Sequence, residues 1–352
     1  MPVSPSYTEN LSAGVAAHYQ EAERRLLLLI AGYLKKDMDA PDWAELKLLQ
    51  VQLLQAQARG LLDRTGRQVA AELALTLSKA ANRGTAVAMA DLAELIRQGL
   101  VVPPALPAVE ALVGETIRAT VGTHPHILRQ TLDTYRAVVA STSPQVLLGT
   151  QTRLQAAQSA LDAFANRGIS GFIDQAGRNW ALESYAEMAT RTATSKAVTS
   201  AYRDQMVAAG EDLVIVSDAP QECELCEPWE GKILSLTGAP RIDDIEVEAT
   251  LDEAEDEGLF HPNCRHSIAL YQPGVTEVPT DTADPEGDRA RQELRRLERG
   301  VRQWKRRSAA ALDDNAKAAA DAKVRDWQAR IRKHVDETPA KRQPQRERLG
   351  AL

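Results

Sequence analysis

Cys223-Glu224-Leu225-Cys226 and His261-Pro262-Asn263-Cys264-Arg265-His266 contain all three cysteines of the 352-residue chain. A Cys-x-x-Cys pair on a turn supplies two ligands for a tetrahedral zinc ion, and Cys264 supplies a third thiolate. His261 or His266 supplies the fourth ligand. The spacing therefore predicts a structural zinc site formed by four of these five residues. Reduced thiols without metal are one alternative, and a disulfide or catalytic role is another.

The same residues do not form a recognisable catalytic set. A cysteine nucleophile needs a base and a third group that orients this base, but both histidines are close neighbours of Cys264 in sequence. A zinc deaminase carries His-x-Glu followed by Pro-Cys-x-x-Cys, whereas here the order is reversed and the glutamate is missing. We therefore predict no enzymatic activity, no catalytic residues and no small-molecule substrate. A nuclease or peptidase domain is the rival hypothesis.

The chain before this region has apolar residues at helical spacing. Gly60 and Gly66 predict a kink or a split in the helix that begins at Trp43, and Asn82-Arg83-Gly84 predicts its end. The further helices expected on this pattern cover residues 8–36, 85–98, 107–120, 124–141, 144–167 and 181–209. Residues 1–212 are therefore predicted to form a helical assembly or docking region.

Short apolar runs of the β type surround the cysteines. They are Leu213-Val214-Ile215-Val216-Ser217, Lys232-Ile233-Leu234-Ser235-Leu236 and Ile268-Ala269-Leu270-Tyr271. We expect a small β-rich Cys/His module over residues 213–274, in which a metal ion would compensate for a small core. The nine acidic side chains of residues 243–257 predict a solvated loop or short helix, with a carboxylate cation site as the alternative.

Charge is unevenly distributed along the chain. The whole chain has a net charge of -7, while residues 288–352 contain 19 Lys and Arg against 10 Asp and Glu, a net of +9, which leaves -16 for the rest. After a linker at residues 275–287, residues 288–352 are expected to form a basic helical hairpin or one long coiled-coil arm with a tail. Six cations of this arm are candidates for salt-sensitive contacts with nucleic-acid phosphates: Arg295, Arg299, Arg302, Lys305, Arg306 and Arg307. A solvated helix or an assembly coiled coil is the alternative for the same pattern.

Composition favours helices packed on helices. Aromatic residues make up only 4% of the chain, which argues against a β-sandwich. Three cysteines do not form a secreted disulfide framework. No signal-peptide pattern is present at the N-terminus, and the apolar run near Leu26 is too short to span a bilayer. The predicted fold class is mainly α, with a long-helix N-terminal region, a small α+β Cys/His module and a basic C-terminal helical arm. We expect a protein that is neither secreted nor bound to a membrane.

Several stretches, in this order, resemble the phage minor capsid protein 2 family. They are Tyr185-Ala186-Glu187-Met188, Val214-Ile215-Val216-Ser217-Asp218, Pro228-Trp229-Glu230-Gly231-Lys232-Ile233, Ser235-Leu236-Thr237-Gly238, Gly258-Leu259-Phe260, Pro262-Asn263-Cys264-Arg265-His266 and Arg302-Gln303-Trp304-Lys305-Arg306. The resemblance is strong over residues 180–335. It implies a component of the virion or procapsid that is related to the minor head proteins of tailed phages and acts in head assembly or DNA delivery.

The resemblance also carries expectations about partners and location. Such proteins are usually encoded beside the portal protein and are present in few copies. The implied partners are the portal protein, other capsid components and packaged DNA, and the implied location is the phage head, or the host cytoplasm during assembly. The family pattern does not always include the Cys223-x-x-Cys226 pair, so the zinc hypothesis depends on the spacing alone. The resemblance supplies no catalytic residues.

Overall fold

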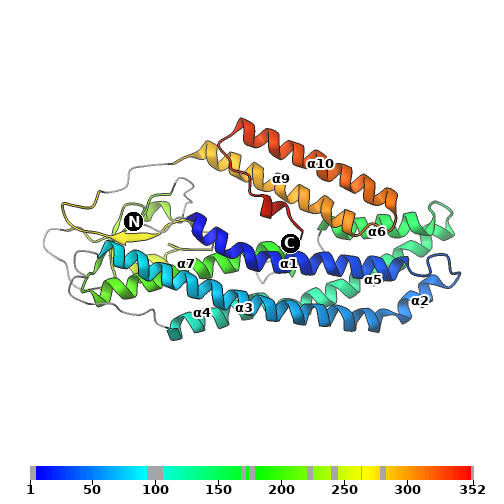
Figure 1. The fold of residues 1–352 in the computed structure, drawn as a ribbon, viewed down its shortest axis with the longest axis horizontal. Helices are drawn as coiled ribbons and strands as arrows, with labels where there is room; N and C mark the ends of the chain where they lie inside the picture. Colours follow the sequence, from blue (N-terminus) through cyan, green and yellow to red (C-terminus); the bar gives the residue numbers. More distant parts are fainter. Residues whose placement is uncertain are drawn as a thin grey trace. The chain divides into compact units, whose positions relative to one another are not determined.

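The computed structural model describes residues 5–92, 106–167, 172–173, 179–219, 225–238, 245–262, 264–277 and 283–349, and helices dominate these ranges (Figure 1). The α-helices are α1 (Pro5–Lys35), α2 (Trp43–Leu49), α3 (Val51–Asp91), α4 (Leu106–Val121), α5 (His124–Leu147), α6 (Arg153–Arg167), α7 (Leu182–Ala208), α8 (Leu251–Asp256), α9 (Pro285–Ala309) and α10 (Asp314–Glu337). The strands are β1 (Phe172–Ile173), β2 (Asn179–Trp180), β3 (Leu213–Val216), β4 (Ile233–Ser235), β5 (Ala249–Thr250) and β6 (Ile268–Leu270). Two short 3-10 turns, Glu227–Trp229 and Pro344–Glu347, complete the regular structure of the described ranges. The prediction of a mainly α fold with a small sheet is confirmed.

Contacts divide the chain into two compact units, each assembled from three segments. Unit 1 consists of Met1–Gly14, Ala70–Ala119 and Glu187–Asp288, and unit 2 consists of Val15–Val69, Thr120–Ala186 and Arg289–Leu352. These units interleave along the sequence. The consecutive ranges 1–212, 213–274, 275–287 and 288–352 stay a prediction about domains.

Helix α3 contradicts the predicted stop at Asn82-Arg83-Gly84. The helix continues to Asp91, which includes the first part of the separate helix expected from residue 85. A Cβ atom at Gly84 would clash with the carbonyl oxygen of Val198 in α7 and would lie 3.0 Å from its carbonyl carbon. This glycine therefore allows two helices of unit 1 to approach closely and does not end one of them. The predicted continuation from residue 93 to 98 lies outside the described residues.

The other helix boundaries that differ from expectation have local causes. The helix that begins at Trp43 is interrupted at Gln50, between α2 and α3. Helix α3 then continues through Gly60 and Gly66, so the predicted split at these glycines is wrong. Residues 144–167 are not one helix, because α5 ends at Leu147 and α6 begins at Arg153. Gly149 has a φ of 66°, the left-handed conformation that commonly terminates helices.

The sheet that carries the cysteine region belongs to unit 1. Its strand order is β5-β4-β3-β6, with β3 antiparallel to both β4 and β6 and with β5 parallel to β4. All four residues of β3 are buried, as expected for a central strand of a small sheet. Helix α8 follows β5 directly, and Thr250 and Glu253 form a capping box at its start. The acidic run is thus partly a short helix, which was one of the predicted outcomes.

Two helices in unit 2 form the predicted basic hairpin. Helices α9 and α10 lie side by side (Figure 1) and share an apolar cluster. A Cβ atom at Gly300 would lie only 2.7 Å from the indole Cδ2 of Trp327, so this glycine leaves room for the ring between the two helices. The buried members of the cluster are Leu294, Leu297, Val301 and Ile331. Within the described ranges no helix combines the length and apolar character that crossing a membrane requires.

Candidate metal centre

The described Cys/His residues come from two loops at one end of the unit 1 sheet. Cys226 precedes the turn Glu227–Trp229, which leads into β4. Cys264 and His266 lie in the loop between α8 and β6, where Gly258 (φ 114°) and Phe260 (φ 59°) adopt left-handed backbone conformations. Because β4 and β6 both pair with β3, the sheet brings these two loops together. Residues 38 positions apart thereby become neighbours.

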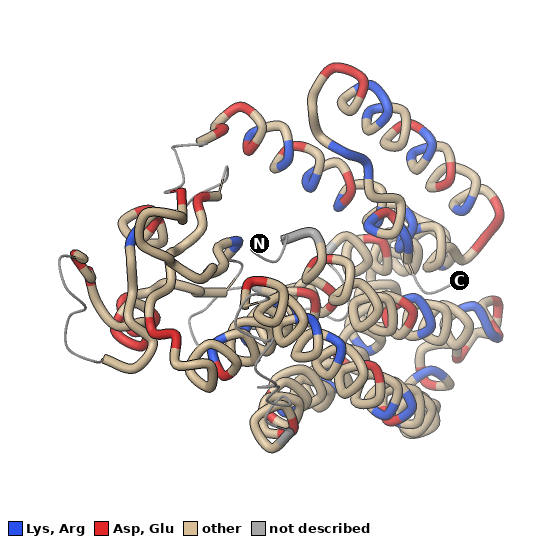
Figure 2. The backbone as a smooth tube through the Cα atoms, turned by 60° about the vertical axis from the view of Figure 1, so that its left-hand side comes forward, with Lys and Arg blue, Asp and Glu red and all other residues tan. Residues whose placement is uncertain are grey.

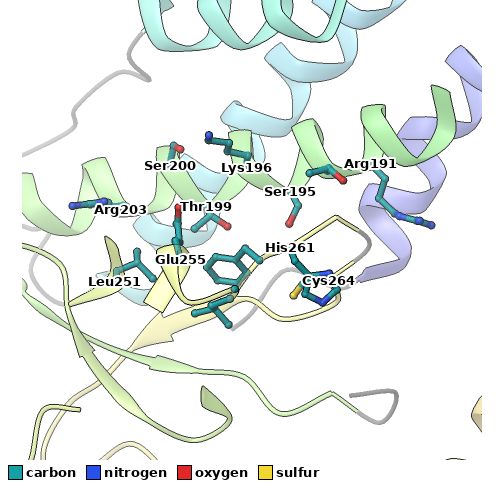
Figure 3. Close-up of a pocket in the computed structure, with 14 residues that line it drawn as sticks. Arg191, Ser195, Lys196, Thr199, Ser200, Arg203, Leu251, Glu255, His261 and Cys264 are labelled. Carbon is teal, nitrogen blue, oxygen red and sulfur yellow. The ribbon is translucent and has the colours of Figure 1, made fainter. Parts of the chain in front are cut away.

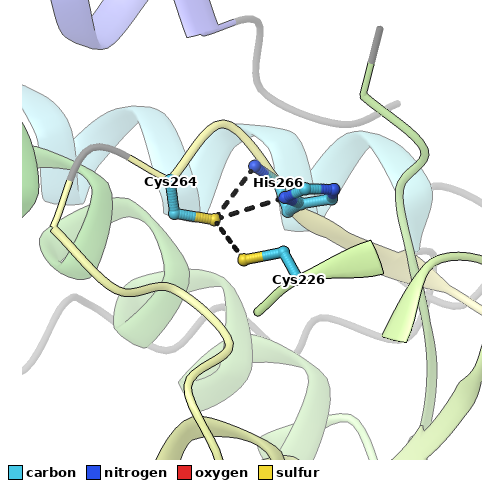
Figure 4. A group of neighbouring side chains, drawn as sticks. All are labelled: Cys226, Cys264 and His266. Carbon is cyan, nitrogen blue, oxygen red and sulfur yellow. Dashed lines mark hydrogen bonds between the residues drawn. The ribbon is translucent and has the colours of Figure 1, made fainter. Parts of the chain in front are cut away.

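Cys226, Cys264 and His266 place their donor atoms in one compact group (Figure 4). The two sulfur atoms are 3.5 Å apart, and the Cys264 sulfur is 3.3 Å from Nδ1 of His266. All three donor atoms lie within 4.8 Å of one another. With Zn–S and Zn–N bonds of about 2.3 and 2.0 Å in a tetrahedron, the expected sulfur–sulfur and sulfur–nitrogen separations are about 3.8 and 3.5 Å. The observed distances match a group that can bind one ion with little movement.

The electrostatics of the group favour the deprotonated, metal-binding form of the Cys264 thiol. Cys226 is fully buried and His266 is 4% exposed. The hydrogen bond with Cys226 lowers the pKa of the Cys264 thiol to about 4 against the opposing effect of burial, and His266 adds to the lowering through both its ring and its backbone N–H. A thiol with such a low pKa is a thiolate at neutral pH, which is the form that binds a metal.

Glu230 is a neighbour of the group that the sequence analysis missed. Its Oε1 atom is hydrogen-bonded to Nε2 of His266 and also accepts a hydrogen bond of 3.2 Å from the backbone N–H of Ala219. Burial alone would lower the pKa of His266, but hydrogen bonds with Cys264 and Glu230 outweigh it and raise this pKa. A carboxylate on the distal ring nitrogen is the usual outer partner of a metal-binding histidine, because it fixes the ring and its tautomer. The Nδ1 atom of His266 therefore faces the sulfur atoms.

Of the other two predicted ligands, His261 is not among the three grouped residues. His261 is hydrogen-bonded through Nδ1 to the carbonyl oxygen of Pro262, at 2.8 Å, and is only partly buried. Cys223 lies outside the described residues. Of the two histidines that the sequence left open, the structure brings His266 to the cysteines.

The six basic candidates of the C-terminal hairpin differ in their surroundings. Figure 2 shows acidic residues interspersed with basic ones along these helices. Arg306 is buried between Glu23 and Glu183, at 2.8 Å from each. Arg302 also lies near Glu183, at 3.7 Å. These two side chains are held inside unit 2 and are not displayed on its surface.

The remaining four candidates are less deeply buried. Arg295 contacts Glu298 at 3.0 Å, and Arg307 forms an ion pair with Asp162 while stacking over Trp304 at 4.4 Å. Burial lowers the pKa of Lys305. Arg299 is exposed and has no hydrogen-bond or ion-pair partner within the ranges that the structure describes. Arg299 is therefore the most accessible cation of the six.

Comparison with known proteins finds similarity to a phage protein. A protein of Lactococcus phage LL-H described as "Structural protein" is 27% identical over 218 residues, a match that covers 58% of this chain and 58% of that protein. The chain thus matches less than two thirds of this relative's length. No solved structure matches.

A family model assigns the chain more specifically. The model described as "Phage minor capsid protein 2" matches residues 3–336. The chain therefore belongs to the phage minor capsid protein 2 family, as the resemblance in the sequence predicted.

Proposed function

We propose that this chain is a minor head protein that acts in head assembly at or near the portal and assists DNA packaging or ejection. The observation that carries the proposal is the family match, which extends over nearly the whole chain. The description of the phage LL-H relative as a structural protein supports the same role. The chain would reside in the phage head after assembling in the host cytoplasm, and would bind the portal protein and other capsid components.

Co-purification with the portal tests this role. The chain and the portal protein of the same phage are co-expressed, and only the portal carries an affinity tag. We expect the chain to elute with the portal in a fixed ratio and to be present in purified heads. A chain that never elutes with the portal, and that is absent from purified heads, would rule out the proposed role.

We further propose that Cys226, Cys264 and His266 bind a structural zinc ion, with Cys223, His261 or a water molecule as the fourth ligand. The compact geometry and the low pKa of Cys264 support this assignment. A structural ion suits the surroundings, because the group lies beside the apolar core that contains Trp229, Leu234 and Ile268. The ion would join the loop before β4 to the loop before β6 and stabilise a sheet whose strands are only two to four residues long.

Metal analysis tests the zinc assignment. Protein purified without chelators should contain about one zinc per chain, and Cys264→Ser should remove it. The fourth ligand can be identified by comparing Cys223→Ser with His261→Gln, since only the variant that removes a ligand should lower zinc affinity. A zinc content far below one per chain in the unmodified protein would exclude the assignment.

DNA binding by the C-terminal hairpin is the second candidate function. The exposed position of Arg299 and the net charge of +9 over residues 288–352 support it. Four of the six candidate cations, however, form ion pairs inside unit 2. Duplex DNA binding at low salt that is weakened by Arg299→Gln would favour this function. Absence of binding at low salt would exclude it.

A further inference from the structure

A cavity of about 430 Å³ lies within unit 1, between α7 and the loop that carries Cys264 (Figure 3). Its volume falls within the range of small-ligand sites, about 300–1,000 Å³. The apolar part of its lining comes from Leu251, Leu259 and Phe260. The opposite wall is a polar stripe along α7 that includes Arg191, Ser195, Lys196, Thr199 and Arg203. This stripe therefore faces a cavity.

The hydroxyl groups on this wall of the cavity differ in whether they already have a hydrogen-bond partner. Thr192 donates a hydrogen bond of 2.9 Å to the carbonyl oxygen of Met188, as serines and threonines inside helices often do. Ser195 and Thr199 line the cavity without a hydrogen-bond partner in the described part of the chain. Figure 3 shows both side chains pointing from α7 toward the opposite wall. They are available to a ligand.

The charges around the cavity favour an anion. Three cations, Arg191, Lys196 and Arg203, line it against a single carboxylate, Glu255. Arg203 is held by Asp252, with Nη2 and Oδ2 3.1 Å apart, and Arg191 lies 4.0 Å from two carboxylates. Lys196 is exposed and attracts the Glu255 carboxylate electrostatically, but it forms no hydrogen bond or close ion pair with a described residue. Of the three cations, Lys196 can therefore reorient toward a ligand without breaking a hydrogen bond or a close ion pair.

We propose that this cavity binds a phosphate ester of about the size of one nucleotide. An ammonium group with three donors and two adjacent hydroxyl groups can satisfy the several oxygens of a phosphate, whereas a carboxylate offers only two oxygens. The partly buried ring of Phe260 and its apolar neighbours then contact the sugar or the base. The phosphate can belong to a free nucleotide or to a single nucleic-acid strand. This site is separate from the C-terminal hairpin, and its lining includes Cys264 of the candidate metal centre.

Calorimetry on the full-length protein at low ionic strength tests the proposal. The probes are inorganic phosphate, adenosine monophosphate and an oligothymidylate of about ten nucleotides. We expect saturable binding of the monophosphate, with affinity about tenfold lower in Lys196→Gln and in the double variant Ser195→Ala/Thr199→Ala. Lys232→Gln removes the same charge from another exposed position of unit 1 and should leave the affinity within about twofold of the wild type.

The probes also identify the source of the phosphate. Tighter binding of the oligothymidylate than of the monophosphate would indicate a nucleic-acid strand, and the reverse order would indicate a free nucleotide. Circular dichroism and zinc content are measured for each variant, so that lost binding is not confused with lost structure. The proposal is overturned if none of the three probes binds saturably. It is also overturned if the cavity variants bind like the wild type or if Lys232→Gln weakens binding as much as Lys196→Gln.

Discussion

The backbone of Val198 in α7 lies directly against Gly84 in α3, so that an added Cβ would be 3.0 Å from the Val198 carbonyl carbon. Backbone cannot move away as a flexible side chain can. We therefore predict that Gly84→Ala lowers the free energy of unfolding by about 1–3 kcal/mol, the usual cost of overpacking a well-packed site. Urea denaturation followed by circular dichroism measures this difference.

Gly32 of α1 provides the matched control, because an added Cβ there meets nothing within 4 Å. Alanine is favoured over glycine in a helix by about 1 kcal/mol. Gly32→Ala should therefore leave the stability unchanged or increase it. Equal effects of the two substitutions would show that the close approach of α7 does not determine the effect at Gly84.

The same glycine shows which parts of the fold the sequence could predict. Long helices with an apolar face were predictable because each repeats the same spacing many times. Gly84 was misread as a helix end, because a glycine that allows close packing and one that ends a helix look alike until the neighbouring helix is known. The break between α5 and α6, which contains Gly149, was also missed. The interleaving of the two units also depends on contacts between distant segments.

For the candidate site, the sequence predicted the ligand types but not their full arrangement. Cys226, Cys264 and His266 were recognisable because cysteine and histidine are rare and their spacing is informative. Glu230 carried no comparable signal, because it is one of many acidic residues and lies 36 positions from His266. Only the pairing of β4 and β6 with β3 brings the two residues together. The cavity proposed to bind phosphate likewise required knowledge of what faces α7.

Asp212 gives the sheet a pH dependence. Its carboxylate accepts hydrogen bonds from Ser235 Oγ at 2.7 Å and from Thr237 N and Oγ1 at 2.7 and 2.6 Å. Burial alone would raise the pKa of Asp212, but the hydrogen bonds from Thr237 and Ser235 outweigh it and lower this pKa. A lowered pKa in the folded state means that the stabilisation is complete above the ordinary carboxyl pKa of about 4 and is lost as the pH falls through the folded value.

Asp212→Asn should therefore reduce the free energy of unfolding by about 1–2 kcal/mol at pH 7. The difference from the wild type should shrink as the pH falls from about 4 to about 2, because the wild-type carboxyl then becomes neutral as well. Chemical denaturation at several pH values measures this dependence. A difference that stays constant between pH 7 and pH 2 would contradict the assigned role.

Arg306 is expected to be essential for the stability of unit 2. It is 9% exposed on its side chain and forms ion pairs with Glu23 and Glu183. Replacing it with methionine leaves two buried carboxylates without this partner, which typically costs about 3–5 kcal/mol. Arg306→Lys keeps the charge and should lower the free energy of unfolding by less.

Arg296→Ala is the control, because it removes an exposed pair with Glu293 and should cost at most about 1 kcal/mol. Thermal unfolding of the three variants tests this order, and a harmless Arg306→Met would refute it.

The contact between Glu230 and His266 yields the most direct test of the metal centre. If the carboxylate orients the ring, Glu230→Gln should weaken zinc binding about 10- to 100-fold, the usual effect of removing an outer partner of a metal ligand. The glutamine keeps the side-chain size and can still accept the hydrogen bond from Ala219, so the loop should stay in place. Competition with a chromophoric chelator measures the affinity.

Glu248→Gln is the control for this substitution, since Glu248 is exposed and paired with Lys232 at 3.1 Å. It removes the same charge from unit 1 and should not change zinc affinity. If both variants bind zinc equally well, Glu230 acts only through its hydrogen bond with Ala219, and the ring of His266 is held by other contacts. If Glu230→Gln alone loses affinity while its circular dichroism is unchanged, the carboxylate positions a true metal ligand. The second result is expected, because His266 can present Nδ1 to the sulfur atoms only while its distal nitrogen is held.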